Sequence, residues 1–242
     1  MHCIILAAGF STRMYPLTKN FPKALLPIKG KAIVDHVYED IREQKEITGT
    51  TVITNDCFYN LFSRHFSRKY PDDTITVINN KVTSVENRQG AIGDLVYVIQ
   101  EQNLRDDLLV IASDTLTSLK MQDFIRFYRQ FKGITTVVFD GQDTEKIKGK
   151  LGCVTVERGK ITQFIEKPEH PTSTLMAVPY YIFPKASLPL LSTFLATNHG
   201  DAPGTFIAWV LPQFPTYAYT MGTGYYHDIG TVSAFEALKA KI

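Results

Sequence analysis

The sequence predicts an α/β fold in three layers, with helices on both faces of a mixed, mostly parallel sheet and a β-rich second half. Strand-like apolar runs alternate with apolar residues at helical spacing up to about residue 140. The run Leu108–Ala112 is wholly apolar, as in parallel strands that are covered on both faces. A hairpin signal follows residue 150, where the alternation stops.

In chain order, the first half supplies five predicted strands and four predicted helices. The strands are expected at 3–8, 50–54, 74–78, 108–112 and 134–139. Helices are expected at 34–45 with Asp35 as an acceptable cap, at 58–66 behind Asp56, at 92–99 and at 121–128. Aromatic stripes at this spacing are typical of a core, which we expect to contain Phe58, Phe62, Phe66, Phe124 and Phe131.

The second half has a different texture. Residues 152–156 and 160–165 flank Glu157-Arg158-Gly159 and predict a hairpin, and most prolines of the chain follow from Pro168 onward. We therefore expect a β-rich, loop-rich half that ends in a helix with Phe235 and Leu238. No Ser/Gly-rich linker separates the halves, so residues 1–242 are expected to form a single domain.

Composition excludes several classes of function. The chain is 44% hydrophobic, and Lys plus Arg (26) exceed Asp plus Glu (24) by only two, without a run of five like charges. We therefore expect a small-molecule partner and no nucleic acid. The cysteines Cys3, Cys57 and Cys153 are odd in number and widely spaced, which predicts neither a disulfide framework nor a zinc site. The N-terminal apolar run is too short for a signal peptide, and no window approaches roughly eighteen apolar residues, so a cytoplasmic protein without membrane contact is expected.

The N-terminal run ends in a loop suited to phosphate. Small residues follow the predicted strand at Ala8-Gly9-Phe10-Ser11-Thr12, where free backbone N–H groups can contact an anion. No Lys follows a second Gly at the Walker spacing, and Gly9 is the only glycine before Gly30, so the dinucleotide fingerprint is absent too.

Two further stretches identify this loop with a known family. Residues 6–18 read L-A-A-G-F-S-T-R-M-Y-P-L-T and residues 22–31 read P-K-A-L-L-P-I-K-G-K. Together they resemble the signature of the nucleoside-triphosphate transferases, the sugar-1-phosphate nucleotidylyltransferases and their relatives. The resemblance implies a Rossmann-like catalytic domain over the whole chain that joins an NTP to a sugar 1-phosphate and releases pyrophosphate. It places the nucleotide on residues 1 to about 145 and the acceptor on about 146–242.

The resemblance also assigns roles within the first stretch. It implies that Arg13 and Lys23 offset the charge that shifts onto the leaving pyrophosphate. The nucleotide-binding residues that it implies in this loop are Leu6, Ala7, Ala8, Gly9, Ser11 and Thr12.

Transfer between two phosphates brings anions together, which Mg²⁺ on one or two carboxylates assists. By position alone, Asp114 after the apolar strand is either such a ligand or a cap or turn aspartate. Asp228, in H-D-I-G-T, is by itself equally consistent with a helix start capped by Thr231. The resemblance makes both aspartates the ligands of Mg²⁺, the expected cofactor.

The acceptor side is assigned from F-I-E-K-P at 164–168 and from the glycine at 152. The resemblance implies that Lys167 contacts the acceptor phosphate, that Glu166 meets a sugar hydroxyl and that Gly152 lets the sugar lie against the backbone. Leu151 stands where the family has an aromatic residue, which leaves sugar specificity open.

The nucleobase is not determined by the sequence. Gly90 at a predicted helix start keeps the close backbone approach of the family. Asn87 and Gln89 either bind a base edge or cap that helix, and both alternatives stay open. His227 beside Asp228 is interpreted as a positioning or structural residue, because an acceptor phosphate needs no general base.

Two other functions remain. A CTP:phosphocholine-type cytidylyltransferase would need a cage for the quaternary ammonium, for which Tyr180, Tyr181, Tyr225 and Tyr226 are candidates. A non-catalytic nucleotide or NDP-sugar sensor of the same fold has no need of a second metal carboxylate. The expected partners are an NTP and a phosphorylated small molecule, and the oligomeric state is left open, a homo-oligomer included.

Overall fold

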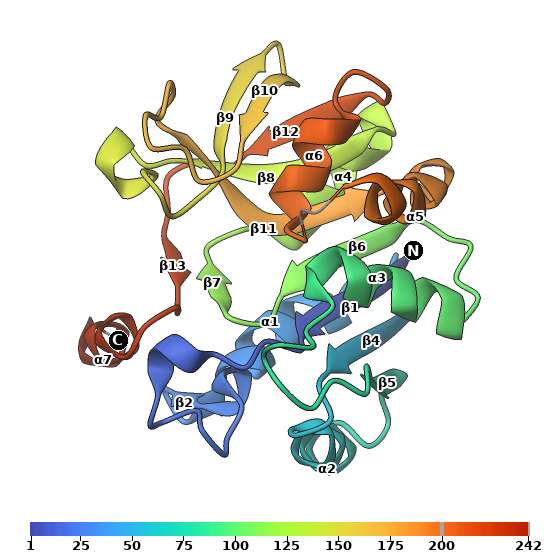
Figure 1. The fold of residues 1–242 in the computed structure, drawn as a ribbon, viewed down its shortest axis with the longest axis vertical. Coiled ribbons are helices and arrows are strands. Elements are labelled where there is room, and N and C mark those ends of the chain that lie inside the picture. Colours follow the sequence, from blue (N-terminus) through green and yellow to red (C-terminus); the bar gives the residue numbers. More distant parts are fainter. Residues whose placement is uncertain (199–200, 242) are drawn as a thin grey trace.

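Within residues 1–198 and 201–241, which this computed structural model describes, nine strands form one mixed sheet with the order β5-β4-β1-β6-β11-β8-β12-β10-β9 (Figure 1). The strands are β1 (His2–Ala7), β4 (Gly49–Thr54), β5 (Ile75–Asn79), β6 (Leu108–Ala112), β8 (Ile134–Asp140), β9 (Cys153–Glu157), β10 (Lys160–Ile165), β11 (Leu175–Phe183) and β12 (Thr216–Thr220). Two short pairs lie outside it, β2 (Pro27–Ile28) with β3 (Lys31–Ala32) and β7 (Thr115–Thr117) with β13 (Tyr226–Asp228).

Helices cover both faces of this sheet. The helices in the described residues are α1 (Ile33–Arg42), α2 (Tyr59–Lys69), α3 (Gly90–Glu101), α4 (Met121–Phe131), α5 (Leu188–Thr197), α6 (Pro203–Val210) and α7 (Val232–Lys241). Buried residues of α1, α2, α4 and α7 belong to one hydrophobic cluster, and those of α3, α5 and α6 to another. The predicted three-layer α/β fold is confirmed. No helix in the described part of the chain is long and apolar enough to cross a membrane.

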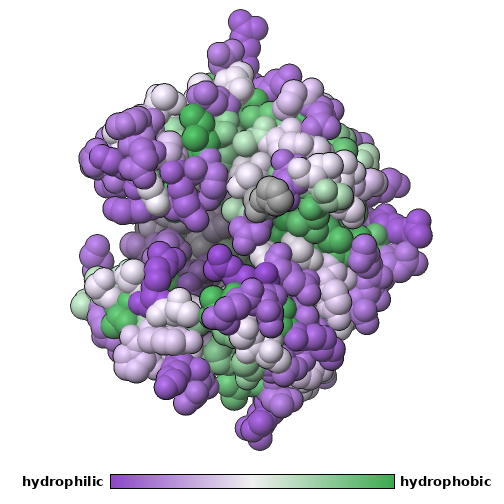
Figure 2. Space-filling model, viewed as in Figure 1, coloured by the Kyte–Doolittle hydropathy of each residue, from purple (hydrophilic) through white to green (hydrophobic). Residues whose placement is uncertain are grey.

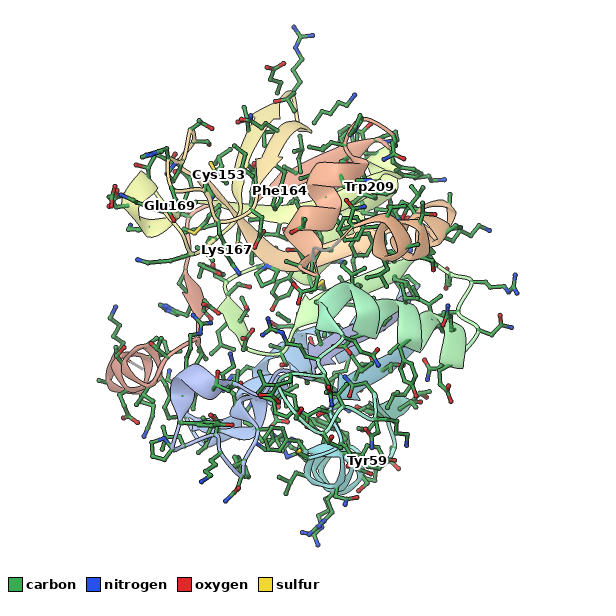
Figure 3. All side chains as sticks on the ribbon, viewed as in Figure 1. Tyr59, Cys153, Phe164, Lys167, Glu169 and Trp209 are labelled. Carbon is green, nitrogen blue, oxygen red and sulfur yellow. The ribbon has the colours of Figure 1, made fainter. Side chains whose placement is uncertain are left out.

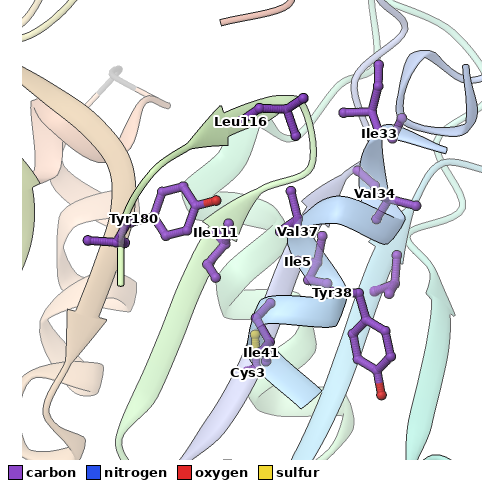
Figure 4. Packing of buried hydrophobic residues seen from close by; sticks show 14 of the residues in the cluster. Cys3, Ile5, Ile33, Val34, Val37, Tyr38, Ile41, Ile111, Leu116 and Tyr180 are labelled. Carbon is purple, nitrogen blue, oxygen red and sulfur yellow. The ribbon is translucent and has the colours of Figure 1, made fainter. Parts of the chain in front are cut away.

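The first half of the sheet is parallel. β1 pairs in parallel with β4 and β6, and β4 with β5, so these strands end at one edge. Apolar side chains of β1 alternate between the two clusters, with Ile5 on the α1 face and Ile4 on the α3 face. Figure 4 shows Ile5 and Ile111 of the sheet in the same cluster as Val37 and Ile41 of α1. The short apolar runs predicted this half because its strands are covered on both faces.

The second half differs more from the prediction. β11 runs antiparallel between β6 and β8, and its register with β8 shifts between Val178 and Tyr181. Pro179, which lacks an N–H, lies within this shift and disguises the strand in the sequence. The expected β-rich half also contains helices α5 and α6, which the sequence analysis did not predict. They are apolar on most sides and therefore lack the contrast between faces that reveals a helix.

Two details of the helices also differ from the prediction. Asp35 is not the cap residue of α1. It lies in the first turn, where its Oδ2 accepts a hydrogen bond from the Ala32 backbone N–H at 3.0 Å. Phe58, Phe62, Phe66 and Phe124 are buried as predicted, whereas Phe131 is half-buried and stacks on Tyr217 with ring centroids 4.7 Å apart.

Thr54, at the end of β4, offers a test of the packing. Its Oγ1 is the only fully buried side-chain nitrogen or oxygen in the described residues without a hydrogen-bond partner. A buried hydroxyl in this state destabilises the fold, and valine has the same shape without it. We expect Thr54→Val to raise the free energy of unfolding by about 1 kcal/mol in urea denaturation.

Thr51 on the same strand is the matched control. Its Oγ1 lies 2.8 Å from His2 Nε2 and donates to Gln102 Oε1 at 2.7 Å. Thr51→Val should therefore lower the free energy of unfolding. Equal losses in both variants would show that the Thr54 hydroxyl is satisfied.

Candidate active site

A cleft of about 400 Å³ lies between the two halves of the protein, beyond the ends of β1 and β6. Figure 2 shows the molecule hollowed between these halves, with hydrophilic residues around the opening. A second hollow of about 350 Å³ adjoins the cleft and shares with it Leu6, Gly9, Ser11, Arg13 and Lys23. The two hollows together offer an elongated site of the size that a nucleotide and a second small molecule require.

The glycine loop after β1 forms the floor between these hollows. Of its residues predicted to bind nucleotide, Leu6, Ala7, Gly9 and Ser11 line the cleft, and Ala8 and Thr12 line the second hollow. Ser11 adopts the left-handed conformation (φ 51°) and begins a short 3₁₀ helix at Thr12–Met14. The turn is tight enough to present backbone N–H groups to an anion.

Two buried side chains, which the sequence analysis did not identify as functional, hold this loop. Thr18 Oγ1 donates to the Ser11 carbonyl oxygen at 2.8 Å, and Asn55 Nδ2 donates to the Ala8 carbonyl oxygen at 3.0 Å. Asn55 Oδ1 also accepts from the Phe58 N–H at the start of α2. The position of Asn55 directly after a parallel strand is the signal that could have revealed it, because such strand ends share one edge.

The two predicted metal carboxylates, Asp114 and Asp228, line the same cleft. Asp114 follows β6, and the pairing of β7 with β13 places Asp228 opposite Thr115, next to Asp114. The Ile229 N–H donates to the Asp114 carbonyl oxygen at 3.1 Å and fixes this register. Burial, and then the negative charge of Asp114, raise the pKa of Asp228. The two negative charges therefore repel each other, and a cation near both carboxylates offsets this repulsion.

Cations surround this pair. Lys23 forms an ion pair with Asp114 Oδ2. Gly230 leaves room for Arg13 beside Asp228, because a Cβ at position 230 would lie 3.3 Å from Arg13 Nη2 and 3.1 Å from Asp228 Oδ2. Both cations line the cleft beside the glycine loop. The arrangement is suited to phosphate groups that carry more than one negative charge.

Lys167 approaches the cleft from the second half. It follows β10 in a left-handed conformation (φ 48°), and its Nζ lies 3.8 Å from Glu166 Oε1. Figure 3 shows Lys167 on the side of this half that faces the first half. Lys150, which the sequence analysis missed, also lines the cleft. A hydrogen bond of 2.9 Å from the Gly149 N–H to the Pro168 carbonyl oxygen holds its loop against the loop that follows Lys167.

Gly152 and Glu166 line the same side of the cleft. A Cβ at Gly152 would lie 2.6 Å from Phe164 Cζ, so a side chain at this position is excluded. Burial raises the pKa of Glu166, against the opposing charge of Lys167. A carboxyl group in this setting accepts hydrogen bonds from neutral donors such as hydroxyl groups.

Other predicted residues are distributed differently. Gly90 and Gln89 line the second hollow, whereas Asn87 is exposed and lines neither hollow. His227 does not line the cleft and stacks on Tyr225 at 5.3 Å. The four tyrosines considered as a cage are divided, because Tyr181 and Tyr226 line the cleft while Tyr180 and Tyr225 line a separate hollow of about 180 Å³.

The donor set fits Mg²⁺ bound largely by its substrates. No group of three or more His, Cys, Asp and Glu side chains in residues 1–198 and 201–241 is placed to hold a metal ion. Asp114 and Asp228 supply two carboxylates, and phosphate oxygens and water would complete an octahedral shell.

Comparison with known proteins agrees with this geometry. The nucleotidyl transferase family model matches residues 2–242. The UTP–glucose-1-phosphate uridylyltransferase AglF of Haloferax volcanii is 25% identical over 204 residues, which cover 83% of this chain and 79% of that protein. The bifunctional protein GlmU of Methanocaldococcus jannaschii is 25% identical over 235 residues, which are 95% of this chain but 51% of GlmU, so the chain spans about half of that protein.

Solved structures show the same fold. A UDP-glucose pyrophosphorylase complexed with UDP-glucose superposes with a TM-score of 0.82 at 19% identity, and the match covers 99% of this chain and 97% of the other. The family match extends from the first residue of β1 to the end of the chain and includes every segment that forms the cleft. The chain is therefore a nucleotidyltransferase that belongs to the nucleotidyl transferase family.

Proposed function

We propose that this enzyme joins an NTP to a sugar 1-phosphate and releases an NDP-sugar and pyrophosphate. One observation carries the proposal: Asp114 and Asp228 line one cleft beside a glycine loop, with Lys23 paired to Asp114 and Arg13 beside Asp228. A phosphate oxygen of the acceptor attacks the α-phosphate of the NTP, and the bond to the β-phosphate breaks, so no proton has to move. Catalysis then depends on position and on neutralised charge.

Each half of the cleft has its own task. Backbone N–H groups of the glycine loop hold the triphosphate, and Arg13 and Lys23 stabilise the negative charge that leaves with pyrophosphate. Asp114 and Asp228 would hold Mg²⁺, which when bound offsets the repulsion between the two substrates. Lys23, which pairs with Asp114, lies beside the glycine loop, where its ammonium group can also contact a phosphate.

The acceptor is assigned to the second half. Lys167 and Lys150 orient its phosphate, while Glu166 and the bare backbone of Gly152 contact its remaining part. A hydroxyl-rich acceptor suits a buried carboxyl group, and the Haloferax relative is named for glucose 1-phosphate. These points favour a sugar 1-phosphate over a phosphoalcohol with a quaternary ammonium, whose aromatic cage the divided tyrosines do not supply.

The test is pyrophosphate release with Mg²⁺ over a grid of ATP, GTP, CTP, UTP and dTTP against several sugar 1-phosphates and phosphocholine. We expect turnover with a sugar 1-phosphate that disappears when the metal is chelated. Turnover with phosphocholine alone would assign the cytidylyltransferase alternative. A blank grid together with tight nucleotide or NDP-sugar binding would assign a sensor and overturn the proposal.

A further inference from the structure

The second hollow contains a buried polar pair that the roles above leave unused. Asn80 directly follows β5, and Asp94 lies one turn inside α3, and both line this hollow together with Gly90. Their exposed fractions are 4% and 7%, so water hydrates neither side chain fully. Polar groups at this depth require hydrogen-bond partners.

The partners within the protein are incomplete. Asn80 Oδ1 accepts from the Val82 N–H at 2.9 Å, and Asn80 Nδ2 donates to Asp94 Oδ1 at 2.7 Å. The other carboxylate oxygen, Asp94 Oδ2, accepts no hydrogen bond from the described residues. It is not sealed off either, because Thr54 Oγ1 is the only fully buried unpaired atom of this kind among them. Asp94 Oδ2 therefore faces the hollow.

The negative charge of Asp94 would be stabilised by a hydrogen-bond donor of a bound ligand. Burial raises the pKa of Asp94 to about 6, with the hydrogen bond from Asn80 opposing this rise and Asp201 adding to it. The carboxyl group is therefore mainly ionised at neutral pH. No Lys, Arg or His of the described residues forms an ion pair with it, although Arg88 lines the same hollow. A ligand that donates a hydrogen bond from an N–H to Asp94 Oδ2 would offset the free-energy cost of burying this unpaired oxygen.

The position of the hollow identifies the part of the ligand that reaches it. Gly9, Ser11 and Arg13 border both hollows, so a nucleotide with its phosphates at the glycine loop and at Asp114 would extend its base toward Asp94. Gly90 takes a left-handed conformation (φ +73°) at the start of α3 and lines the hollow, and the Asp201 side chain packs against its Cα, where a Cβ would lie 2.1 Å from Asp201 Cβ.

We propose, on the basis of the proposed function, that Asp94 reads the nucleobase and selects an NTP whose base carries an exocyclic amino group over UTP and dTTP. An amino group of cytosine, adenine or guanine donates to Oδ2, and the second N–H of Asn80 Nδ2 remains available for the acceptor beside it. Uracil and thymine instead carry a carbonyl oxygen on each side of a single N–H. One of these carbonyl oxygens would lie against the carboxylate, and the two acceptors would repel each other.

Calorimetric binding of CTP, ATP, GTP, UTP and dTTP to the wild type and to Asp94→Asn tests this assignment. We expect at least one amino-bearing NTP to bind the wild type roughly tenfold or more tightly than UTP does. Asp94→Asn should reduce this ratio by about tenfold, since its amide can donate to the O4 carbonyl of uracil. Glu101→Gln, on the exposed far end of α3, is the matched control and should leave the ratio unchanged.

Two results would overturn the assignment: tightest binding of UTP or dTTP by the wild type, or an unchanged ratio in an Asp94→Asn variant that melts like the wild type. The outcome is separable from that of the proposed function. Base selection without turnover on any sugar 1-phosphate would leave the assignment of Asp94 intact and refute the proposed reaction with a sugar 1-phosphate. Turnover with a sugar 1-phosphate and equal use of all five NTPs would support the proposed reaction and refute the assignment of Asp94.

Discussion

Asp228→Asn is expected to lower the rate of pyrophosphate release by roughly a hundredfold or more, while NTP binding weakens much less. The variant loses a negative charge that interacts with that of Asp114, and with it one of the two carboxylates proposed to hold Mg²⁺. The triphosphate still meets the glycine loop, Arg13 and Lys23, which lie on the same side of the cleft. Steady-state kinetics and calorimetric NTP binding on the same preparation separate the two effects.

Asp123→Asn is the matched control for this variant. Asp123 pairs with Arg126 on the surface of α4 and does not line the cleft, so turnover should be unchanged. If Asp228→Asn weakened NTP binding and turnover in parallel, Asp228 would be a residue of ground-state binding. Its catalytic assignment would then be wrong.

Asp35→Asn is expected to lower the free energy of unfolding by about 3 kcal/mol at neutral pH. Asp35 is 1% exposed and accepts hydrogen bonds from His65 Nε2 and Lys69 Nζ, both at 2.7 Å. The Ala32 N–H and the Tyr70 hydroxyl also donate to it. This carboxylate therefore joins the start of α1 to the far end of α2, and a neutral amide cannot accept all of these bonds.

The loss should depend on pH in a defined direction. Burial alone would raise the pKa of Asp35, but the hydrogen bonds from His65 and Lys69 outweigh it and hold the pKa at about 2. A folded pKa below the unfolded value means that the stabilisation is present above about pH 4 and is lost between about pH 4 and pH 2. Urea denaturation at several pH values should therefore bring the variant and the wild type together in acid.

Asp72→Asn provides the comparison, because Asp72 is exposed two residues beyond Tyr70 and should tolerate the change at every pH. A loss for Asp35→Asn that stayed constant from pH 7 to pH 2 would exclude the ionised carboxylate as its origin. The effect would then have to come from packing around α1 and α2.

The parallel half of the fold and the position of the glycine loop could be predicted from local sequence patterns. Strands such as β6 are buried on both faces, so their apolar character is visible without knowledge of their neighbours. Asp114 could be singled out because it follows such a strand directly. The order of residues in the glycine loop was equally informative, since a phosphate site made of backbone N–H groups is local in the chain.

Which distant side chains share the cleft depends on how the strands pair in the folded chain. Asp228 meets Asp114 through the register of β7 with β13, and Asn80 meets Asp94 because β5 ends beside α3. The second half was harder to predict because β11 contains a proline and because α5 and α6 are apolar on most sides. Local patterns depend on the nearest few residues, whereas the pairing of strands across the sheet depends on how the whole chain buries its apolar side chains. This pairing brings the two halves together around one cleft.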